Sequence, residues 1–237
     1  MAPRDGEVTG MSRITIQYVR AIFLWVCLMA STAGSDMHRD TESPTTIQLP
    51  RPARSGVVSH EEALSQRRST REFAPGPLSE RQLSQLLWAA QGTTSSEGYR
   101  TAPSAGALYP LEIYVVLSTG FYHYKPDLHR LDRVSAEDLR PALCRAALEQ
   151  EAIKEAETVF VMTAVYERTV RKYGTERSPR YVHLEAGHAA QNLLLEAVAL
   201  GLGGVPIGAF HDGEVQRVLS LPRDHQPLYL IPVGKPR

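Results

Sequence analysis

Apolar residues form short runs along the chain that predict the strands of a buried sheet. Residues 158–166 read TVFVMTAVY and are apolar at successive positions, which is typical of a central strand with both faces covered. Residues 111–118, LEIYVVLS, predict a second strand, and Gly120 marks the turn into a third strand over residues 121–125. Two further strands are predicted over residues 203–210 and 228–233.

Between these strands the apolar positions repeat at helical spacing. A Ser-x-x-Gln capping pattern begins at Ser79 and precedes a helix to Ala90 with leucines on one face. The longest helix is predicted over residues 181–200, and shorter helices over residues 60–68 and 135–148. Helices and strands do not alternate regularly, and a hairpin lies mid-chain. The pattern therefore predicts an α+β fold rather than a doubly wound parallel sheet.

The beginning of the chain differs from the rest. Residues 21–30, AIFLWVCLMA, form an apolar run that follows Arg13 and Arg20 and precedes the small residues STAGS. This arrangement has the parts of a secretory signal over residues 1–35, with a cut after Ala33. The run is too short for a stable membrane span, which needs roughly 18 apolar residues.

The compartment depends on how this segment is interpreted. A working signal would place the protein in the periplasm or outside the cell. If the start is over-extended and Met11 or Met37 is the true first residue, the protein stays in the cytoplasm. Residues 36–56 are polar and proline-bearing without a sustained period, which predicts a linker. One folded domain is therefore expected over residues 57–237.

Composition narrows the range of partners. The chain has 237 residues, and its 26 Lys and Arg balance 26 Asp and Glu, so the formal net charge is zero. A general nucleic-acid binder would usually carry a basic excess. Cys27 and Cys144 are too few for a disulfide framework, and no Cys-x-x-Cys pair suggests zinc. We therefore expect no nucleic-acid partner and no metal.

Some segments resemble well-known motifs but lack the surroundings that those motifs need. Residues 201–206, GLGGVP, begin like a dinucleotide fingerprint, but they follow a helix and enter a strand, which is the reverse of the required order. Ser104 lies in APSAG, which resembles the nucleophile elbow of serine hydrolases, but a loop precedes it and a strand follows. We therefore expect neither a Rossmann-type site nor a serine hydrolase.

Residues 67–73, RRSTREF, concentrate positive charge and hydroxyl groups after the first predicted helix. Guanidinium groups present paired donors that match phosphate oxygens, and a serine hydroxyl adds another donor. Arg67, Arg68, Ser69 and Arg71 can supply this set. The same residues would suit a solvated surface, because positive charge is favoured at a helix C-terminus. The stretch alone leaves both interpretations open.

Four stretches taken together carry a more specific signal. They are RRSTREF, residues 101–110 (TAPSAGALYP), Lys172-Tyr173 ahead of residues 183–195 (HLEAGHAAQNLLL), and residues 203–210 (GGVPIGAF). In this order they resemble the nitroreductase family of flavoproteins, and most of all its SagB-type dehydrogenase branch, which oxidises azoline rings in ribosomal peptides. The resemblance implies a nitroreductase-like α+β fold, with a mostly antiparallel central sheet flanked by helices. It also implies an intertwined homodimer with flavin sites at the subunit boundary.

The resemblance implies which residues bind the cofactor, FMN. They are Arg67, Arg68, Ser69, Arg71, Pro103, Ser104, Ala105, Gly106, Leu108, Pro206, Ile207, Gly208, Ala209, Lys235 and Arg237. The loop around Ser104 would line the pocket or reach the flavin of the partner subunit. Many family members carry an asparagine in this loop, and this chain has none between Thr101 and Pro110. Small residues at 208 and 209 leave the backbone open to a flat ring, although a bulged strand would look the same.

Lys172 and Tyr173 are the candidate catalytic residues. In azoline-oxidising relatives a Lys-Tyr pair is assigned to proton removal from the substrate ring as hydride leaves for the flavin. A lysine in an apolar pocket can act as a base because burial lowers its pKa. The alternative is a solvated polar loop that also contains Arg168, Arg171 and Arg177.

The expected function is that of an FMN-dependent oxidoreductase that passes hydride through its flavin. One version is SagB-type dehydrogenation of an azoline-like peptide substrate. The alternative is an NAD(P)H-dependent reductase of nitro compounds or quinones. A non-catalytic flavin-binding protein is the remaining alternative.

Overall fold

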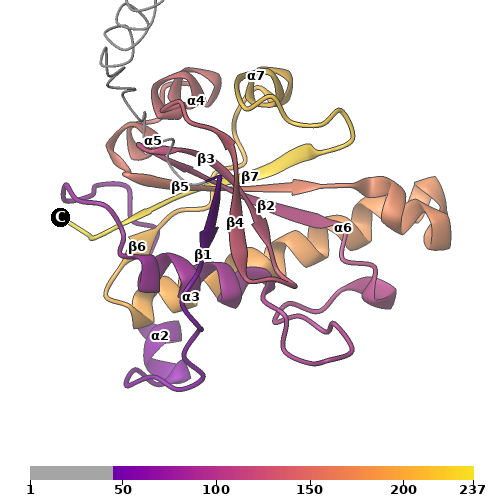
Figure 1. Cartoon of the computed structure of the whole chain (residues 1–237), viewed down its shortest axis with the longest axis horizontal. Helices are drawn as coiled ribbons and strands as arrows, with labels where there is room; N and C mark the ends of the chain where they lie inside the picture. The colour runs from indigo at the N-terminus through magenta and orange to yellow at the C-terminus, as the bar shows by residue number, and fades with distance from the viewer. Residues whose placement is uncertain (1–44) are drawn as a thin grey trace, which may run out of the picture. The chain divides into compact units, whose positions relative to one another are not determined.

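The computed structural model describes residues 45–237, which form a seven-stranded sheet with helices on both faces (Figure 1). The predicted signal segment, residues 1–35, and residues 36–44 of the predicted linker lie outside the described residues. The strand order is β1-β4-β3-β2-β5-β7-β6, and every neighbouring pair is antiparallel. The predicted α+β fold with a mostly antiparallel sheet is therefore confirmed.

Strand β5 (Thr158–Ala164) lies inside the sheet, between β2 (Leu111–Leu117) and β7 (Gln226–Gly234). All of its residues are buried. Both faces of the strand are covered, so its sequence is apolar without alternation. This confirms the prediction of a central strand at this position.

The predicted helix over residues 135–148 is wrong in its first part. Strand β4 (Arg130–Ser135) pairs with β3 (Gly120–Lys125) and includes Ser135, so the helix begins later, as α4 (Arg140–Ala146), and a separate short helix, α5 (Glu151–Glu155), follows it. Only Leu131 of β4 is buried, so the strand has little apolar pattern of its own. The strand forms because it pairs with a neighbouring strand on each side, and its own sequence does not predict this pairing.

The predicted linker is also wrong in its second half. Strand β1 (Thr46–Gln48) pairs with β4 at the edge of the sheet, and Leu49 is only 4 % exposed. The Ser84 hydroxyl donates to the Pro50 carbonyl over 2.6 Å and ties the segment to a helix. A strand of three residues is too short to show a period in the sequence. It forms by pairing with residues that are distant in the chain. The fold therefore begins before residue 57.

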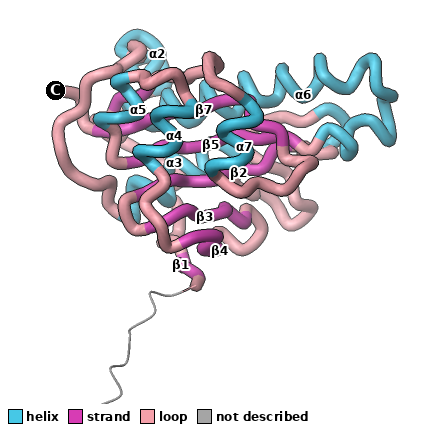
Figure 2. The backbone as a smooth tube through the Cα atoms, turned by 90° about the horizontal axis from the view of Figure 1, so that it is seen from above, coloured by secondary structure: helices cyan, strands magenta, loops and turns pink. Residues whose placement is uncertain are grey.

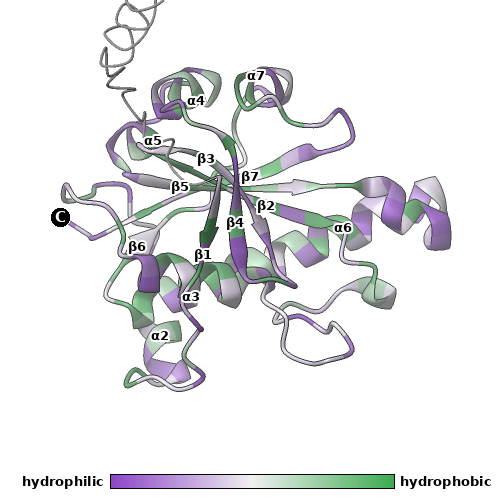
Figure 3. Ribbon diagram, viewed as in Figure 1, coloured by the Kyte–Doolittle hydropathy of each residue, from purple (hydrophilic) through white to green (hydrophobic). Residues whose placement is uncertain are grey.

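Helices α2 (His60–Gln66), α3 (Glu80–Gln91) and α6 (Tyr166–Ala199) cover one face of the sheet (Figure 1). Helices α4, α5 and α7 (Asp212–Val218) cover the other face. Figure 3 shows β1 in green and β4 largely in purple, while the helices carry both hydrophobic and hydrophilic residues. Within the part of the chain that the structure describes, no helix combines the length and apolar character that a membrane crossing requires.

Helix α6 is longer than the helix predicted over residues 181–200. It contains 34 residues in two segments, interrupted at Gly174, whose φ is 74°. Glycine suits this position because it has no Cβ to clash at positive φ. Figure 2 shows α6 extending past the sheet on one side. The alternative of a solvated loop over residues 168–177 is wrong in its conformation, since these residues belong to α6, but Arg171, Lys172 and Arg177 are exposed.

Candidate functional site

The arginine- and serine-rich stretch lies along strand β6 (Gly203–Gly204) at the edge of the sheet. Ser69 forms a parallel bridge with Gly204, and the Thr70 N–H donates to the Gly204 carbonyl over 3.1 Å. A Cβ atom at Gly203 would collide with the Thr70 side chain, so this close approach requires glycine. The structure thus joins residues 67–71 to the start of the glycine-containing segment.

The C-terminal residues pack against the same stretch. The Ala74 N–H donates to the Lys235 carbonyl over 2.9 Å, and Arg237 Nη2 donates to the Phe73 carbonyl over 3.2 Å. The Arg237 guanidinium also lies 3.6 Å from a carboxylate oxygen of Glu155. Lys235 and Arg237 therefore lie beside the arginine-rich stretch, but Arg237 already has an acidic partner.

Several cationic side chains at this point have no acidic partner. Among residues 45–237, Arg67, Arg71 and Lys235 take part in no ion pair. Arg68 differs, because its Nη1 donates to the carbonyls of Ser65 and Arg67 over 3.0 and 2.8 Å. Cationic side chains without acidic partners on neighbouring segments favour binding of an anion.

Residues 206–209 continue from β6 along β7. Ile207 exchanges two backbone hydrogen bonds with Leu230, of 2.9 and 3.0 Å. The following residues, Gly208 and Ala209, are exposed. A Cβ at Gly208 would meet only Tyr229 within 4 Å, at 3.9 Å, so packing does not require glycine there. The effect of the missing side chain is to leave the backbone open on the outer side.

The loop of residues 103–108 turns tightly before β2 in a left-handed conformation. The φ angles are 65° at Gly106, 52° at Ala107 and 45° at Tyr109. Ser104 holds the turn, because its Oγ accepts the Tyr109 N–H over 2.9 Å. Arg168 Nη1 donates to the Tyr109 carbonyl over 2.8 Å. Positive φ costs energy at non-glycine residues, so these contacts hold a strained loop in place.

Lys172 and Tyr173 meet the backbone of this loop at Gly106. A Cβ at Gly106 would lie 2.7 Å from Lys172 Nζ and 2.9 Å from Tyr173 Oη. Lys172 is exposed and Tyr173 is half-buried. The pair is therefore joined to the predicted loop, but a single chain does not enclose Lys172 in the apolar pocket that the base hypothesis assumes.

The predicted residues form two groups along α6. Residues 67–71, 203–209 and 235–237 form the β6 half-site, which reaches α6 at Leu194, 3.2 Å from a Cβ placed at Gly204. Residues 103–108 and 172–173 form the loop half-site, which lies at the first segment of α6, where Lys172 and Tyr173 meet Gly106.

Glu112 and Glu185 flank the loop half-site, and the sequence analysis missed both. Glu112 receives a hydrogen bond from Arg168 and lies 2.6 Å from His123 Nε2. Burial opposes ionisation of Glu112, but the hydrogen bonds and charges of His123 and Arg168 outweigh it and lower the pKa to about 2.

Glu185 has the opposite character. Burial raises the pKa of Glu185 to about 7, while hydrogen bonds from Ser104 and Gln91 act in the other direction. The signal in the sequence is its spacing, because Glu185 falls on the same helical face as Val182 and Ala189, where an apolar residue is expected.

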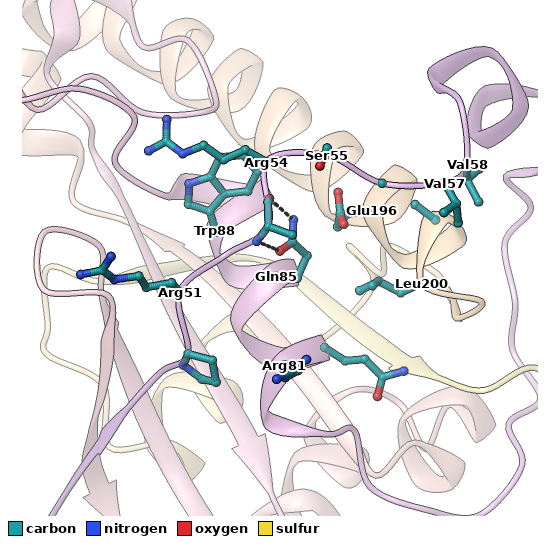
Figure 4. Close-up of a pocket in the computed structure, with 15 residues that line it drawn as sticks. Arg51, Arg54, Ser55, Val57, Val58, Arg81, Gln85, Trp88, Glu196 and Leu200 are labelled. Atoms are coloured by element: carbon teal, nitrogen blue, oxygen red, sulfur yellow. Dashed lines mark hydrogen bonds between the residues drawn. The ribbon is translucent and has the colours of Figure 1, made fainter.

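A cavity of about 810 Å³ lies between residues 50–58 and helices α3 and α6 (Figure 4). Arg51, Arg54 and Trp88 contribute to its wall, and Gln85 hydrogen-bonds the backbone of Ala53 beside it. None of the residues predicted for the site lines this cavity. Its position therefore does not mark either half-site.

The strand order, the antiparallel pairing and the two helical layers define a nitroreductase fold. The sequence matches the profile of the "Nitroreductase family" over residues 64–235, so the chain belongs to this family of oxidoreductases. It is 46% identical over 184 residues to a Methanocaldococcus jannaschii protein assigned to the nitroreductases, MJ1384, over 75% of this chain and 91% of that protein. A crystal structure of a Ralstonia eutropha protein with the same assignment has a TM-score of 0.75 and 32% identity, over 83% of this chain and 91% of that one.

Two further likenesses are partial. The trifolitoxin-processing protein TfxB of Rhizobium leguminosarum bv. trifolii is 32% identical over 153 residues, which is 57% of this chain and 41% of TfxB. The NADPH:FMN oxidoreductase of Vibrio harveyi, solved in complex with NAD+, has a TM-score of 0.57 and 23% identity over 75% of this chain and 68% of that one. At this identity the Vibrio structure shows only the shared fold.

Proposed function

We propose that the protein is an FMN-dependent oxidoreductase that binds the cofactor at the β6 half-site. The observation that carries the proposal is that Arg67, Arg71 and Lys235 belong to segments joined at one end of β6 and β7 and take part in no ion pair, while the exposed backbone of Gly208 and Ala209 follows farther along the same strand pair. A phosphate monoester carries close to two negative charges near neutral pH and suits such donors. The open backbone suits a flat ring, because no large side chain covers it.

Bound flavin supplies the capacity to accept an electron pair as hydride and to return it to a second substrate. The arginines, Lys235 and the Ser69 hydroxyl hold the phosphate end. The backbone N–H groups of Gly208 and Ala209 would stabilise the negative charge that builds up on reduction, since Pro206 has no N–H and the Ile207 N–H already donates to Leu230. Both contributions depend on donors fixed by β6 and β7 before the cofactor arrives.

We further propose a homodimer in which the loop half-site of one subunit completes the β6 half-site of its partner. Within one chain the loop half-site lies at the first segment of α6 and the β6 half-site at Leu194 in its second segment, and Pro103, Gly106 and Lys172 are exposed on the loop side. Light scattering should give twice the 26.2 kDa of one chain. A monomer that binds FMN fully would contradict this arrangement.

The finer proposal is SagB-type dehydrogenation of an azoline-like peptide. Two observations favour it: the 32% identity to a toxin-processing protein, and the contact of Lys172 and Tyr173 with the predicted loop. In this reaction the pair accepts the substrate proton as hydride leaves the adjacent carbon. NAD(P)H-driven reduction of a nitro compound or quinone is the second candidate, favoured by the shared fold with an oxidoreductase solved with NAD+. A flavin-binding protein without catalysis is the third.

Titration of the ligand-free full-length chain with FMN tests cofactor binding, with flavin fluorescence as the readout. The double change Arg67→Ala and Arg71→Ala should weaken binding at least tenfold, because two charge-assisted contacts are lost. Arg54→Ala, in the separate cavity, is the matched control and should leave the affinity unchanged. Absence of FMN uptake by the unaltered chain would refute the proposed function.

The three candidate functions differ in which substrate exchanges electrons with the FMN-bound protein. Incubation with azoline-containing peptides, followed by mass spectrometry, should show loss of two hydrogens per ring. Lys172→Ala should abolish this loss while the protein still takes up FMN. Rapid anaerobic bleaching of the flavin by NADH or NADPH, without peptide oxidation, would favour the reductase instead. If the protein reacts neither with the peptides nor with NADH or NADPH, the non-catalytic flavin-binding protein is the remaining candidate.

The proposal for the beginning of the chain is an export signal over residues 1–35, followed by a tether to the fold. An over-extended start is the alternative, and it would make the protein cytoplasmic. N-terminal sequencing of the native protein separates the two. A first residue just after Ala33 supports export, whereas Met11 or Met37 supports the alternative.

A further inference from the structure

The cavity between residues 50–58 and helices α3 and α6 has a wall that hydrogen bonds hold in place (Figure 4). Gln85 of α3 exchanges two hydrogen bonds with the backbone of Ala53, of 2.8 and 3.1 Å. The Pro50 carbonyl accepts the Ser84 hydroxyl over 2.6 Å. The wall is therefore anchored to α3 at two points, and the cavity is formed by the fold itself.

Trp88 of α3 supplies a flat apolar surface to this cavity. A Cβ atom at Gly92 would lie 2.2 Å from Cδ1 of the indole ring, so the glycine leaves the room that this ring position requires. Trp88 also lines a smaller cavity of about 330 Å³, which shares Val58, Glu196 and Ala199 with the larger one. The indole thus borders two adjoining cavities, where a flat ligand ring can stack against it.

Three arginines contribute to the wall of the cavity: Arg51, Arg54 and Arg81. Within residues 45–237 none of them takes part in an ion pair. Arg81 lies in the first turn of α3, where the helix dipole opposes a positive charge. The stability of the helix therefore does not account for Arg81, whereas an anion in the cavity would.

Glu196 is the one acidic residue among the described residues that line the cavity. It forms no ion pair with the three arginines, and burial raises its pKa. The wall therefore carries an excess of positive charge. Its other residues include an apolar set: Pro50, Val57, Val58, Ala199 and Leu200. This combination suits a ligand with an apolar body and a negative group.

We propose that this cavity binds a small organic anion with a flat aromatic body and a carboxylate or phosphate group. The aromatic body stacks on Trp88, and the arginines receive the anionic group. The volume of about 810 Å³ is within the range of cavities that hold small organic ligands, roughly 300–1,000 Å³. The inference does not depend on the proposed function, because no residue of the two half-sites lines this cavity.

Isothermal titration calorimetry of the full-length chain with naphthoate tests the site. Naphthoate should bind saturably, with one molecule per chain. Neutral naphthamide should bind about tenfold more weakly, because it lacks the charge that the arginines receive. Tighter binding of naphthyl phosphate than of naphthoate would identify a phosphate ligand, and weaker binding a carboxylate ligand. If neither anion binds saturably below about 1 mM, the proposal is overturned.

Substitutions in the wall should change the affinity for naphthoate in both directions. The double change Arg51→Ala and Arg81→Ala should weaken binding about five- to twentyfold, because two exposed charge contacts are lost. Glu196→Gln should strengthen it about two- to fivefold, because a repelling carboxylate is removed, and should leave naphthamide binding unchanged. A damaged fold cannot produce this selective gain. Weaker binding of naphthoate to Glu196→Gln would count against the site.

Arg145→Ala is the matched control for the arginine changes. Arg145 is an exposed residue of α4, on the other face of the sheet, and it does not line the cavity. The variant should bind naphthoate as the unaltered chain does. A loss equal to that of the double change would show that naphthoate responds only to overall charge, and the proposed site would fall.

Competition with FMN separates this site from the flavin site. FMN also combines a flat ring with a phosphate, so it could itself occupy the cavity. Naphthoate should bind equally well with and without saturating FMN. If FMN displaces naphthoate, the two share one site and the second site falls. If naphthoate binds but the chain takes up no FMN, the proposed function falls and this site stands.

Discussion

Two glutamates lie close to the same loop and have opposite acid–base properties. Glu112 is paired with His123 and Arg168, whereas Glu185 accepts a hydrogen bond from the neutral amide of Gln91. Both are largely removed from water, and in both burial is the largest single influence on the pKa. Direct hydrogen bonds from potentially cationic side chains reverse the effect of burial at Glu112 but not at Glu185. The lesson is that immediate partners, rather than depth, decide the charge state.

The difference has opposite consequences for stability against pH. The pKa of Glu112 falls from 4.5 to about 2 on folding, so its contribution is present above pH 4.5 and is lost as pH falls toward 2. The pKa of Glu185 rises from 4.5 to about 7, so the unfolded chain releases its proton first, and stability falls as pH rises from 4.5 to 7.

Glu112→Gln should have the largest effect on stability. The change removes the ionised partner of Arg168 and His123, and at pH 7 the free energy of unfolding should fall by about 3 kcal/mol, from about 1.4 kcal/mol per unit of pKa shift. Urea unfolding at pH 7 and pH 3 measures it, and the loss should shrink at the lower pH. Glu167→Gln, at an exposed position of α6, is the control. A loss below about 1 kcal/mol at pH 7 would mean that the ion pair is only a surface contact.

Glu185→Gln should remove the decrease in stability with rising pH that Glu185 causes. The unaltered chain should lose roughly 2–3 kcal/mol between pH 4.5 and 8 because of Glu185, and the variant should not. The variant should therefore gain stability relative to the unaltered chain as pH rises. Urea unfolding across this range measures the difference. A variant whose curve runs parallel to the unaltered chain would show that Glu185 ionises normally.

Arg168→Gln should have the smallest effect on stability. It should change the pKa of Glu112 and the pKa of Glu185 by unequal amounts. Arg168 donates directly to Glu112 but acts on Glu185 only through its charge, as the weakest influence there. The pKa of Glu112 should rise more than that of Glu185, with a stability loss of about 1–2 kcal/mol from the lost hydrogen bonds. Carboxyl carbon NMR titration of both residues tests this. Equal shifts would contradict the distinction between the two sites.

The sequence predicts correctly those helices and strands that have a clear hydrophobic pattern of their own. Strand β5 and helix α3 are correct because an apolar run and a capped, periodic helix carry their own signals. Strands β1 and β4 were missed because each is fixed by pairing with distant residues. The prediction for helix α6 is too short because the first segment of this helix is polar and ends at Gly174.

The same division applies to the site. The four stretches singled out in the sequence form two groups in space, and Ser69 pairs with Gly204 across 135 positions. The carboxylates beside the loop were not found, because their properties come from partners that are distant in sequence. Glu185 accepts a hydrogen bond from Gln91, and a single sequence gives no sign that these two residues meet.

The three-residue strand β1 has a practical consequence for anyone who prepares this protein. A chain trimmed to Val57, the boundary that local pattern suggests, would leave β4 as the border of the sheet, with the backbone groups of Arg130–Asp132 unpaired. Such a border invites association with other chains. Starts at Met37 or just after Ala33 both retain β1, so either should give material that stays dispersed where the shorter version precipitates.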